Sequence, residues 1–263
     1  MYSNTGVPYR YIEQIVRQHE KQLENSLRYE RFVVDETVQD WRMLLGDDVI
    51  ALTHPYRTAK VAEKCIKSDM ENHLKLSKKE QLLLYTACYV HDFGELFIGH
   101  EGVGDITFEK HNSDHMNIEK DIFSKLLATL ADNPQKSLIK SAYYDVVMKK
   151  TTKVGAVFDI VERIGYLETG LRAFVGVAGK RIKNWKGLTG NVLSNQIKPL
   201  LAYSEKYPFI GRLLKKYQKT ITSAFKETIS GDVPQDKNNE KSFDSQKLQM
   251  NYESWKTSAF FGG

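Results

Sequence analysis

Apolar residues recur at three- and four-residue steps along most of the chain, which is the period of an amphipathic helix. A clear case spans residues 8–32, where the apolar positions stand among Glu, Gln, Lys and Arg. Sustained alternation of apolar and polar residues, which is typical of a strand, is absent from the sequence. The pattern therefore predicts an all-α fold.

Local signals indicate where several of these helices begin. Thr53 is expected to be an N-cap, with Pro55 in the first turn of a helix that continues to about Lys67. The run Ser77-Lys78-Lys79-Glu80 is a capping box, and it opens an apolar helix that ends near His91. Further helices are expected over 112–131, 135–149, 153–176, 190–204 and 208–229.

The helical pattern predicts a single helical domain over residues 1–229. The polar, irregular stretch 230–246 contains GDVPQDKNNEKSFDSQ, which is typical of a flexible linker. The C-terminal tail, residues 247–263, regains aromatic residues. It is expected to dock on the body of the protein or on a partner.

Composition places the chain among ordinary globular proteins, with 41% hydrophobic and 27% charged residues in a length of 263. The net charge of +5 favours an anionic substrate but is too small to argue for nucleic-acid binding by itself. Cys65 and Cys88 lie among apolar residues and are expected to be buried thiols. Without a signal-peptide pattern or a run of about 18 apolar residues, we expect a cytoplasmic protein without a membrane segment.

The candidate chemistry centres on His54, His91 and Asp92. His54 shares a helical face with apolar residues and His91 ends an apolar stripe, so both imidazoles are expected to point inward. With the adjacent carboxylate of Asp92 they form a mixed nitrogen and oxygen ligand set that several divalent metals accept. For each histidine alone, a hydrogen-bonded core residue is the alternative.

Asp159 is the candidate fourth ligand. It lies in the run GAVFDIVERIGYLE, where the small residues Gly155 and Ala156 would let another helix or a metal approach closely. The alternative is an ion pair with Arg163 four residues later, a weak contact on a helix surface. Glu95, one turn after the His91–Asp92 pair, is placed to act on a metal-bound water.

These residues resemble the H…HD…D signature of the HD-domain phosphohydrolases. His54 matches the first histidine, Val90-His91-Asp92 contains the HD pair, and Asp159 matches the last aspartate. The resemblance covers about residues 35–180. It implies an HD-domain helical bundle with additional C-terminal helices, in which the four side chains hold one divalent ion (Mn, Co, Zn, Fe, Ni or Mg).

The continuation from His91 to Gly99 is most similar to the branch that contains the bacterial 5′-deoxynucleotidases, where a Glu follows the pair by three residues and a Gly-containing loop comes next. By that match Glu95 orients or deprotonates the attacking water. The implied activity is removal of phosphate from small nucleotides, above all (deoxy)nucleoside 5′-monophosphates, by attack of a metal-bound water. Relatives in this branch are often dimers, so a homodimer is in keeping with the resemblance.

The substrate side of the site has two competing alignments. The family often has Gly-Asp after this Glu and a Lys a few residues later. Gly104-Asp105 precedes Lys110 here, so Asp105 and Lys110 are expected to face the substrate, while the competing alignment puts His100 in the Asp position. Arg57, on the predicted helix after Thr53, is a further candidate for phosphate contact, with an exposed helix arginine as the alternative.

His111 and His115 raise the question of a second metal ion, because they stand four residues apart on one predicted helical face. Two-metal HD proteins, which include cyclic-dinucleotide phosphodiesterases, carry extra histidines in this region. The sequence around these two lacks the other pattern of that class, and residues 112–114 are typical of a helix cap. A solvated helix start is therefore the preferred interpretation.

Other functions stay open at this point. A dNTP triphosphohydrolase or a cyclic-nucleotide phosphodiesterase would differ from the leading prediction in its product. A degenerate HD module could bind a nucleotide or partner protein without turnover, although the intact ligand set and Glu95 argue against it. The basic clusters 180–186 and 215–219 contain aromatics but are also what solvated helix faces look like, so nucleic acid is not an expected partner.

Overall fold

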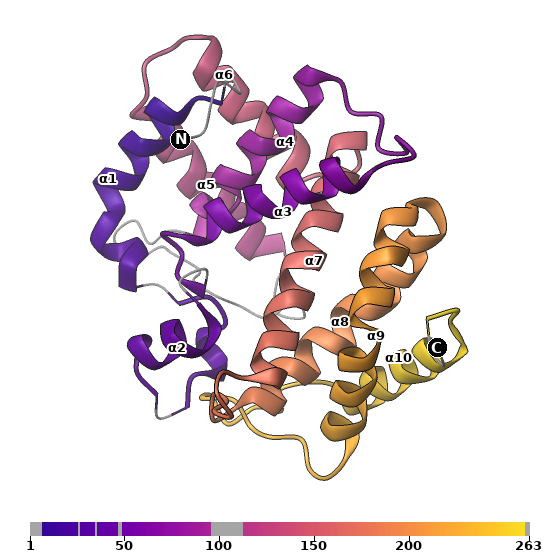
Figure 1. The fold of residues 1–263 in the computed structure, drawn as a ribbon. Coiled ribbons are helices and arrows are strands. Elements are labelled where there is room, and N and C mark those ends of the chain that lie inside the picture. The colour runs from indigo at the N-terminus through magenta and orange to yellow at the C-terminus, as the bar shows by residue number, and fades with distance from the viewer. Residues whose placement is uncertain (1–6, 26, 35, 47–48, 96–112, 261–263) are drawn as a thin grey trace. The chain divides into compact units, whose positions relative to one another are not determined.

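The computed structural model describes residues 7–25, 27–34, 36–46, 49–95 and 113–260 (Figure 1). In these ranges the regular structure is helical, and extended pairing is limited to isolated bridges. The all-α prediction is confirmed. Figure 1 shows a long connection between α9 and α10, the stretch that precedes the C-terminal helix.

The chain forms two compact units whose sequence ranges interleave. Unit 1 contains Met1–Arg28, Asp48–Ala62 and Leu76–Asp159, and unit 2 contains Tyr29–Asp47, Glu63–Lys75 and Ile160–Gly263. All the predicted metal ligands lie in unit 1. The single domain expected over 1–229 stays a prediction, and each unit is described by itself.

Unit 1 brings the helices that carry the candidate ligands onto one apolar core. Its elements are α1 (Tyr9–Asn25), α3 (His54–Ser68), α4 (Lys78–Val90), the 3₁₀ turn η3 (His91–Glu95), α5 (Ser113–Ala128), α6 (Pro134–Ser141), the π-helix η5 (Ala142–Val147) and α7 (Lys153–Val175). The last residues of α3 and most of α7 belong to unit 2. Helix α4 packs on α6 and η5, while α5 packs on η3.

Helix starts in unit 1 follow the local signals in the sequence. At α4 the capping box is present, because Ser77 Oγ accepts from the Glu80 amide at 3.3 Å and Glu80 Oε2 accepts from the Ser77 amide at 2.7 Å. Helix α3 begins at His54, directly after Thr53. The helix expected over 8–32 ends at Asn25, since Leu27 forms an isolated antiparallel bridge beyond it.

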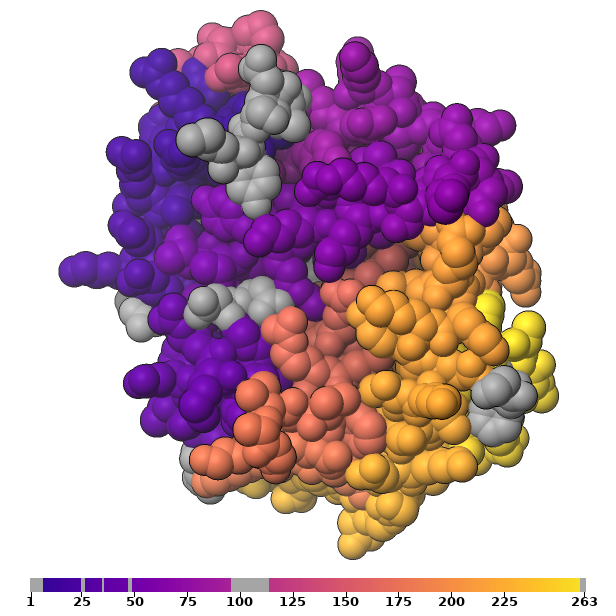
Figure 2. All heavy atoms as spheres, viewed as in Figure 1, coloured from indigo at the N-terminus to yellow at the C-terminus, as the bar shows by residue number. Residues whose placement is uncertain are grey.

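Unit 2 contains η1 (Glu30–Phe32), α2 (Val38–Leu45), α8 (Trp185–Lys206), α9 (Pro208–Ile229) and α10 (Ser245–Thr257). Helices α8, α9 and α10 pack on one another. Helix α9 is amphipathic, with Phe209, Leu214 and Phe225 buried while Lys215 and Lys216 are exposed. Part of α9 lies at the surface in Figure 2 (orange). The exposed lysines agree with a solvated basic face.

Residues 230–246 differ from the flexible linker that their composition indicated. Ser242 and Phe243 are buried, and the Arg31 guanidinium donates to the Ser242 carbonyl at 2.6 Å. The buried Asp236 carboxylate accepts two backbone amides of its own loop. The Ser242 carbonyl and Asp236 Oδ1 accept from protein donors, and Asp236 Oδ2 lies 4.0 Å from Arg31 Nε, so the segment packs as part of unit 2.

The C-terminal tail docks on unit 2 as a helix, which the sequence analysis left open. Trp255 of α10 is fully buried, and its Nε1 donates to Thr222 Oγ1 at 2.9 Å. The Phe260 ring stacks on Trp255 with centroids 6.2 Å apart. The tail therefore contributes a large side chain to the core of this unit.

Replacing Trp255 with Ala should lower the free energy of unfolding by about 3–5 kcal/mol, because it leaves a cavity under α10. The matched control is Met250→Ala on the same helix, whose residue is 63% exposed, and it should change stability by less than about 0.5 kcal/mol. Urea unfolding measures both. Equal effects of the two variants would contradict the docking of α10.

Cys65 and Cys88 are both buried and neither forms a disulfide, as predicted. Burial raises the pKa of the Cys65 thiol from 9.0 to about 12, with a smaller contribution from Glu168. Because the folded-state pKa is raised, the unfolded chain loses this proton first as the pH passes 9.0, and folding stability falls from there towards about 12.

The wild-type protein should therefore lose about 1 kcal/mol more stability between pH 8 and pH 10 than Cys65→Ala does. Urea unfolding at the two pH values checks this. The comparison with Cys65→Ala removes the contribution of every other titrating group. Parallel losses in the two proteins would show that the thiol does not contribute.

Candidate metal centre

Two elements of unit 1, α3 and η3, bring two imidazoles and a carboxylate together. His54 is the first residue of α3, and His91 and Asp92 open η3 directly after α4. The apolar face of α4 ends in the buried residues Cys88 and Val90, so the next residues stay inside the protein. His54, His91 and Asp92 are only 7%, 6% and 7% exposed, and the inward orientation predicted for both histidines is confirmed.

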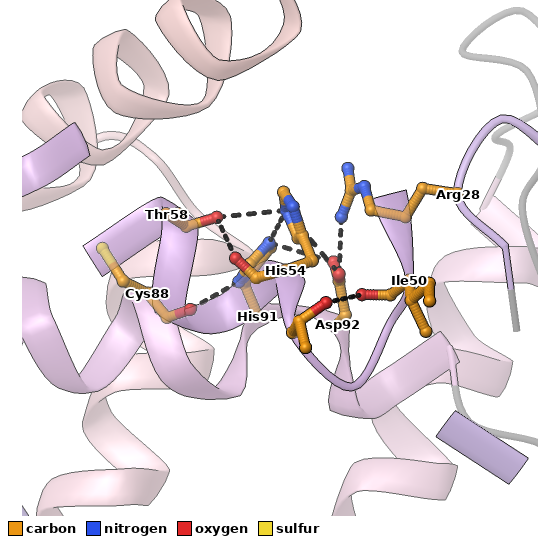
Figure 3. A network of polar contacts seen from close by, with 8 residues as sticks. Arg28, Ile50, His54, Thr58, Cys88, His91 and Asp92 are labelled. Carbon is orange, nitrogen blue, oxygen red and sulfur yellow. Dashed lines mark hydrogen bonds and ion pairs between the residues drawn. The ribbon is translucent and has the colours of Figure 1, made fainter. Parts of the chain in front are cut away.

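The three side chains converge on one point (Figure 3). The Nε2 atoms of His54 and His91 lie 3.1 Å apart, and His91 Nε2 lies 3.1 Å from Asp92 Oδ1. His54 Nε2 lies 3.9 Å from Asp92 Oδ2. One ligand atom from each residue lies within 4.8 Å of the other two.

This donor set fits a divalent metal ion. His91 Nδ1 donates to the Cys88 carbonyl at 2.9 Å, which fixes the ring and leaves the Nε2 lone pair directed at His54. Two nitrogens bound to one ion at ordinary lengths are about 3.0 Å apart in octahedral and about 3.3 Å apart in tetrahedral geometry. The observed separation of 3.1 Å lies between these values.

Arg28 is a site residue that the sequence analysis missed. Its Nη1 donates to Asp92 Oδ2 at 2.5 Å, and the two side chains are 13% and 9% exposed. Burial opposes ionisation of Asp92, but the charge of Arg28 and the hydrogen bond that Arg28 donates help to outweigh it, so the pKa of the carboxyl is lowered. Asp92 is therefore a carboxylate, the form that binds a metal.

Backbone pairing explains how Arg28 reaches the site. The Arg28 amide donates to the Val49 carbonyl at 2.8 Å, next to the bridge between Leu27 and Ile50. This pairing holds the residues after α1 beside those that lead into α3. Arg28 and Asp92 are 64 positions apart, so no local pattern in the sequence links them.

Asp159 stays a predicted ligand. Its Oδ1 lies 3.7 Å from Lys150 Nζ, and among the described residues it is not part of the group whose donor atoms lie within 4.8 Å. The neighbouring Phe158 ring packs on the His91 ring with centroids 5.6 Å apart. Arg163, the alternative partner, donates to Gln196 Oε1 at 2.9 Å.

Glu95 ends η3 and is half-buried, and the turn that carries it rests on Tyr143 and α5. A Cβ atom at Gly94 would overlap the Tyr143 hydroxyl and approach the Glu119 carbonyl to 2.9 Å. Tyr143 is fully buried, stacks on Phe123 at 3.6 Å and donates to that same carbonyl at 3.4 Å. Burial, with the nearby carboxylates of Glu119 and Glu95, raises the pKa of Tyr143, so its hydroxyl stays protonated.

The remaining predicted site residues are not tested by the structure. Arg57 on α3 and His115 on α5 are half-buried, and their roles stay predictions. Among the described residues, His115 does not belong to a group of three or more candidate ligands. His100, Asp105, Lys110 and His111 lie outside the described residues.

The basic cluster around residues 180–186 makes contacts within unit 2. The Arg181 guanidinium lies 4.8 Å from the Phe174 ring centroid and 4.5 Å from that of Trp185. Lys186 donates to the Asp232 carbonyl at 3.0 Å. Residues 180–184 lie in the turn before α8, so the interpretation of this cluster as a solvated helix face is wrong for these residues, whose contacts are those of a packed turn. None of the described helices is long and apolar enough to span a membrane.

No protein-family model matches the chain, and searches of curated proteins and of solved structures find no significant match.

Gly94→Ala should weaken Mn²⁺ binding by at least about tenfold, because the added methyl group displaces η3 from Tyr143 and moves Asp92 with it. Isothermal titration with Mn²⁺ measures this. In the double variant Gly94→Ala/Tyr143→Phe the overlapping hydroxyl is gone, so part of the affinity should return. A double variant no better than Gly94→Ala would contradict this packing.

Proposed function

We propose that unit 1 carries a divalent-metal-dependent phosphohydrolase that removes phosphate from small nucleotides, with deoxynucleoside 5′-monophosphates as the first substrates to test. The observation that carries the proposal is the convergence of His54, His91 and Asp92 in a buried donor set. The spacing of these residues along the sequence, with Asp159 and Glu95, resembles the HD-domain phosphohydrolases and supports the same reaction class.

His54, His91 and Asp92 would hold the metal ion, with Asp159 as the proposed fourth ligand. When bound, such an ion lowers the pKa of a water and offsets the negative charge of a phosphoryl group. The donors suit this role because a neutral imidazole and an ionised carboxylate are the forms that ligate divalent cations.

The side chains beside the cluster would supply the rest of the chemistry. Glu95 would accept the proton of the attacking water. A general base in this role typically raises the reaction rate by a factor of about 10²–10⁴. The η3 turn holds Glu95 three residues after Asp92, within one turn of backbone. Arg28 keeps the Asp92 carboxylate ionised and oriented.

A panel of nucleotides assayed for products with several metals tests the proposal. Wild-type protein should release inorganic phosphate, chelation should abolish the release, and Co²⁺ or Mn²⁺ should restore it. Asp92→Ala should lose both metal binding and turnover. Glu95→Gln should keep the metal affinity within about twofold while the rate falls by about 10²–10⁴.

Asp145→Ala is the matched control, because this exposed carboxylate pairs with Lys149 at 2.9 Å, and its removal should leave turnover unchanged. Circular dichroism of each variant separates a loss of fold from a loss of chemistry. Phosphate release by Asp92→Ala at the wild-type rate would contradict the proposal. Tripolyphosphate or a linear nucleotide as product would instead favour the two alternative hydrolases, and tight nucleotide binding without product would favour a non-enzymatic module.

A further inference from the structure

Lys150, in the turn between η5 and α7, is held in an uncommon backbone conformation. Its φ of 49° lies in the left-handed region, which side chains other than glycine rarely adopt. The Lys150 amide donates to the Val146 carbonyl at 3.3 Å. Backbone strain of this kind persists only where the surrounding structure fixes it.

The start of α7 supplies that constraint. A Cβ atom at Gly155 would lie 2.8 Å from the Lys150 Cα, so the first turn of the helix packs directly against the strained residue. Thr152 Oγ1 accepts the Gly155 amide at 3.0 Å and donates to the Asp145 carbonyl at 3.4 Å. The position of Lys150 is therefore fixed from both sides.

This backbone places the Lys150 ammonium beside Asp159, the proposed fourth ligand. Its Nζ lies 3.7 Å from Asp159 Oδ1 and 5.8 Å from the centroid of the Phe158 ring. The Phe158 ring packs in turn on His91. The Lys150 side chain is 41% exposed, so a solute that approaches Asp159 can reach it.

We propose that Lys150 is a phosphate-binding residue of this site, shared between Asp159 and the phosphate group of a nucleotide. The inference deepens the proposed function and rests on it for the location of the metal. A phosphate monoester carries close to two negative charges at neutral pH, and an ammonium donates up to three hydrogen bonds. Lys150 can therefore contact the phosphate while it stays beside Asp159.

The chain offers a matched control in Lys153. It lies three residues later and is similarly exposed (47%), but its ammonium pairs with Glu80 at 3.3 Å. Met is the replacement of choice at both positions because it keeps the length of the side chain and removes the charge. Since Met is also a non-glycine residue, Lys150→Met keeps the left-handed backbone cost unchanged.

The test measures binding of inorganic phosphate and of deoxyadenosine 5′-monophosphate to Mn²⁺-loaded Glu95→Gln protein by isothermal titration. Adding Lys150→Met should lower the affinity for both ligands by at least about tenfold. Adding Lys150→Arg should restore most of the affinity, and adding Lys153→Met should leave it within about twofold. The affinity for Mn²⁺ alone should not fall in Lys150→Met, because a positive charge beside a metal ligand is removed.

Unchanged phosphate affinity in Lys150→Met would overturn the inference, and so would a loss of Mn²⁺ affinity in that variant, which would assign Lys150 only to ordering Asp159. The outcome is separable from that of the proposed function. Lys150-dependent phosphate binding by a wild-type protein that hydrolyses no nucleotide would uphold the inference and reject the activity. Nucleotide hydrolysis whose KM is unchanged by Lys150→Met would uphold the activity and reject the inference.

Discussion

The ion pair between Arg28 and Asp92 is the interaction on which the candidate site depends. Moving an ionised carboxylate out of water costs several kcal/mol, and only a close opposite charge with good hydrogen-bond geometry offsets that cost. Arg28 provides both at 2.5 Å. Because Asp92 is held as a carboxylate beside two imidazoles, the three side chains form a donor set and not merely a polar patch in the core.

Apolar packing keeps this donor set in place. The end of helix α4 is buried in unit 1 up to its last residue, Val90, so His91 follows inside the core. The Cys88 carbonyl orients the His91 ring. The η3 turn then lies on the Tyr143 hydroxyl, with no room for a side chain at Gly94. Positions 94 and 143 thus constrain each other, and the geometry of the polar site depends on close contact between uncharged groups.

Two positively charged side chains lie beside the carboxylates of the candidate site, and they differ in their exposure to solvent. Arg28 neutralises Asp92, and Lys150 lies beside Asp159. Arg28 is nearly buried, whereas the Lys150 side chain is 41% exposed. The two cations are therefore suited to different tasks, the first to stabilising a buried ligand and the second to meeting an anion from solution.

The sequence by itself determined the helices and the inward direction of the two histidines, because helical period and capping boxes are local. The Ser77–Glu80 box and the start of α3 at His54 are examples. Only the tertiary structure decided which distant residues meet. Arg28 reaches Asp92 through backbone pairing near Val49, Tyr143 supports Gly94, and the polar stretch 230–246 finds buried partners. These contacts join residues that are far apart in the sequence, where no local periodicity links them. They can therefore be seen only in the folded structure.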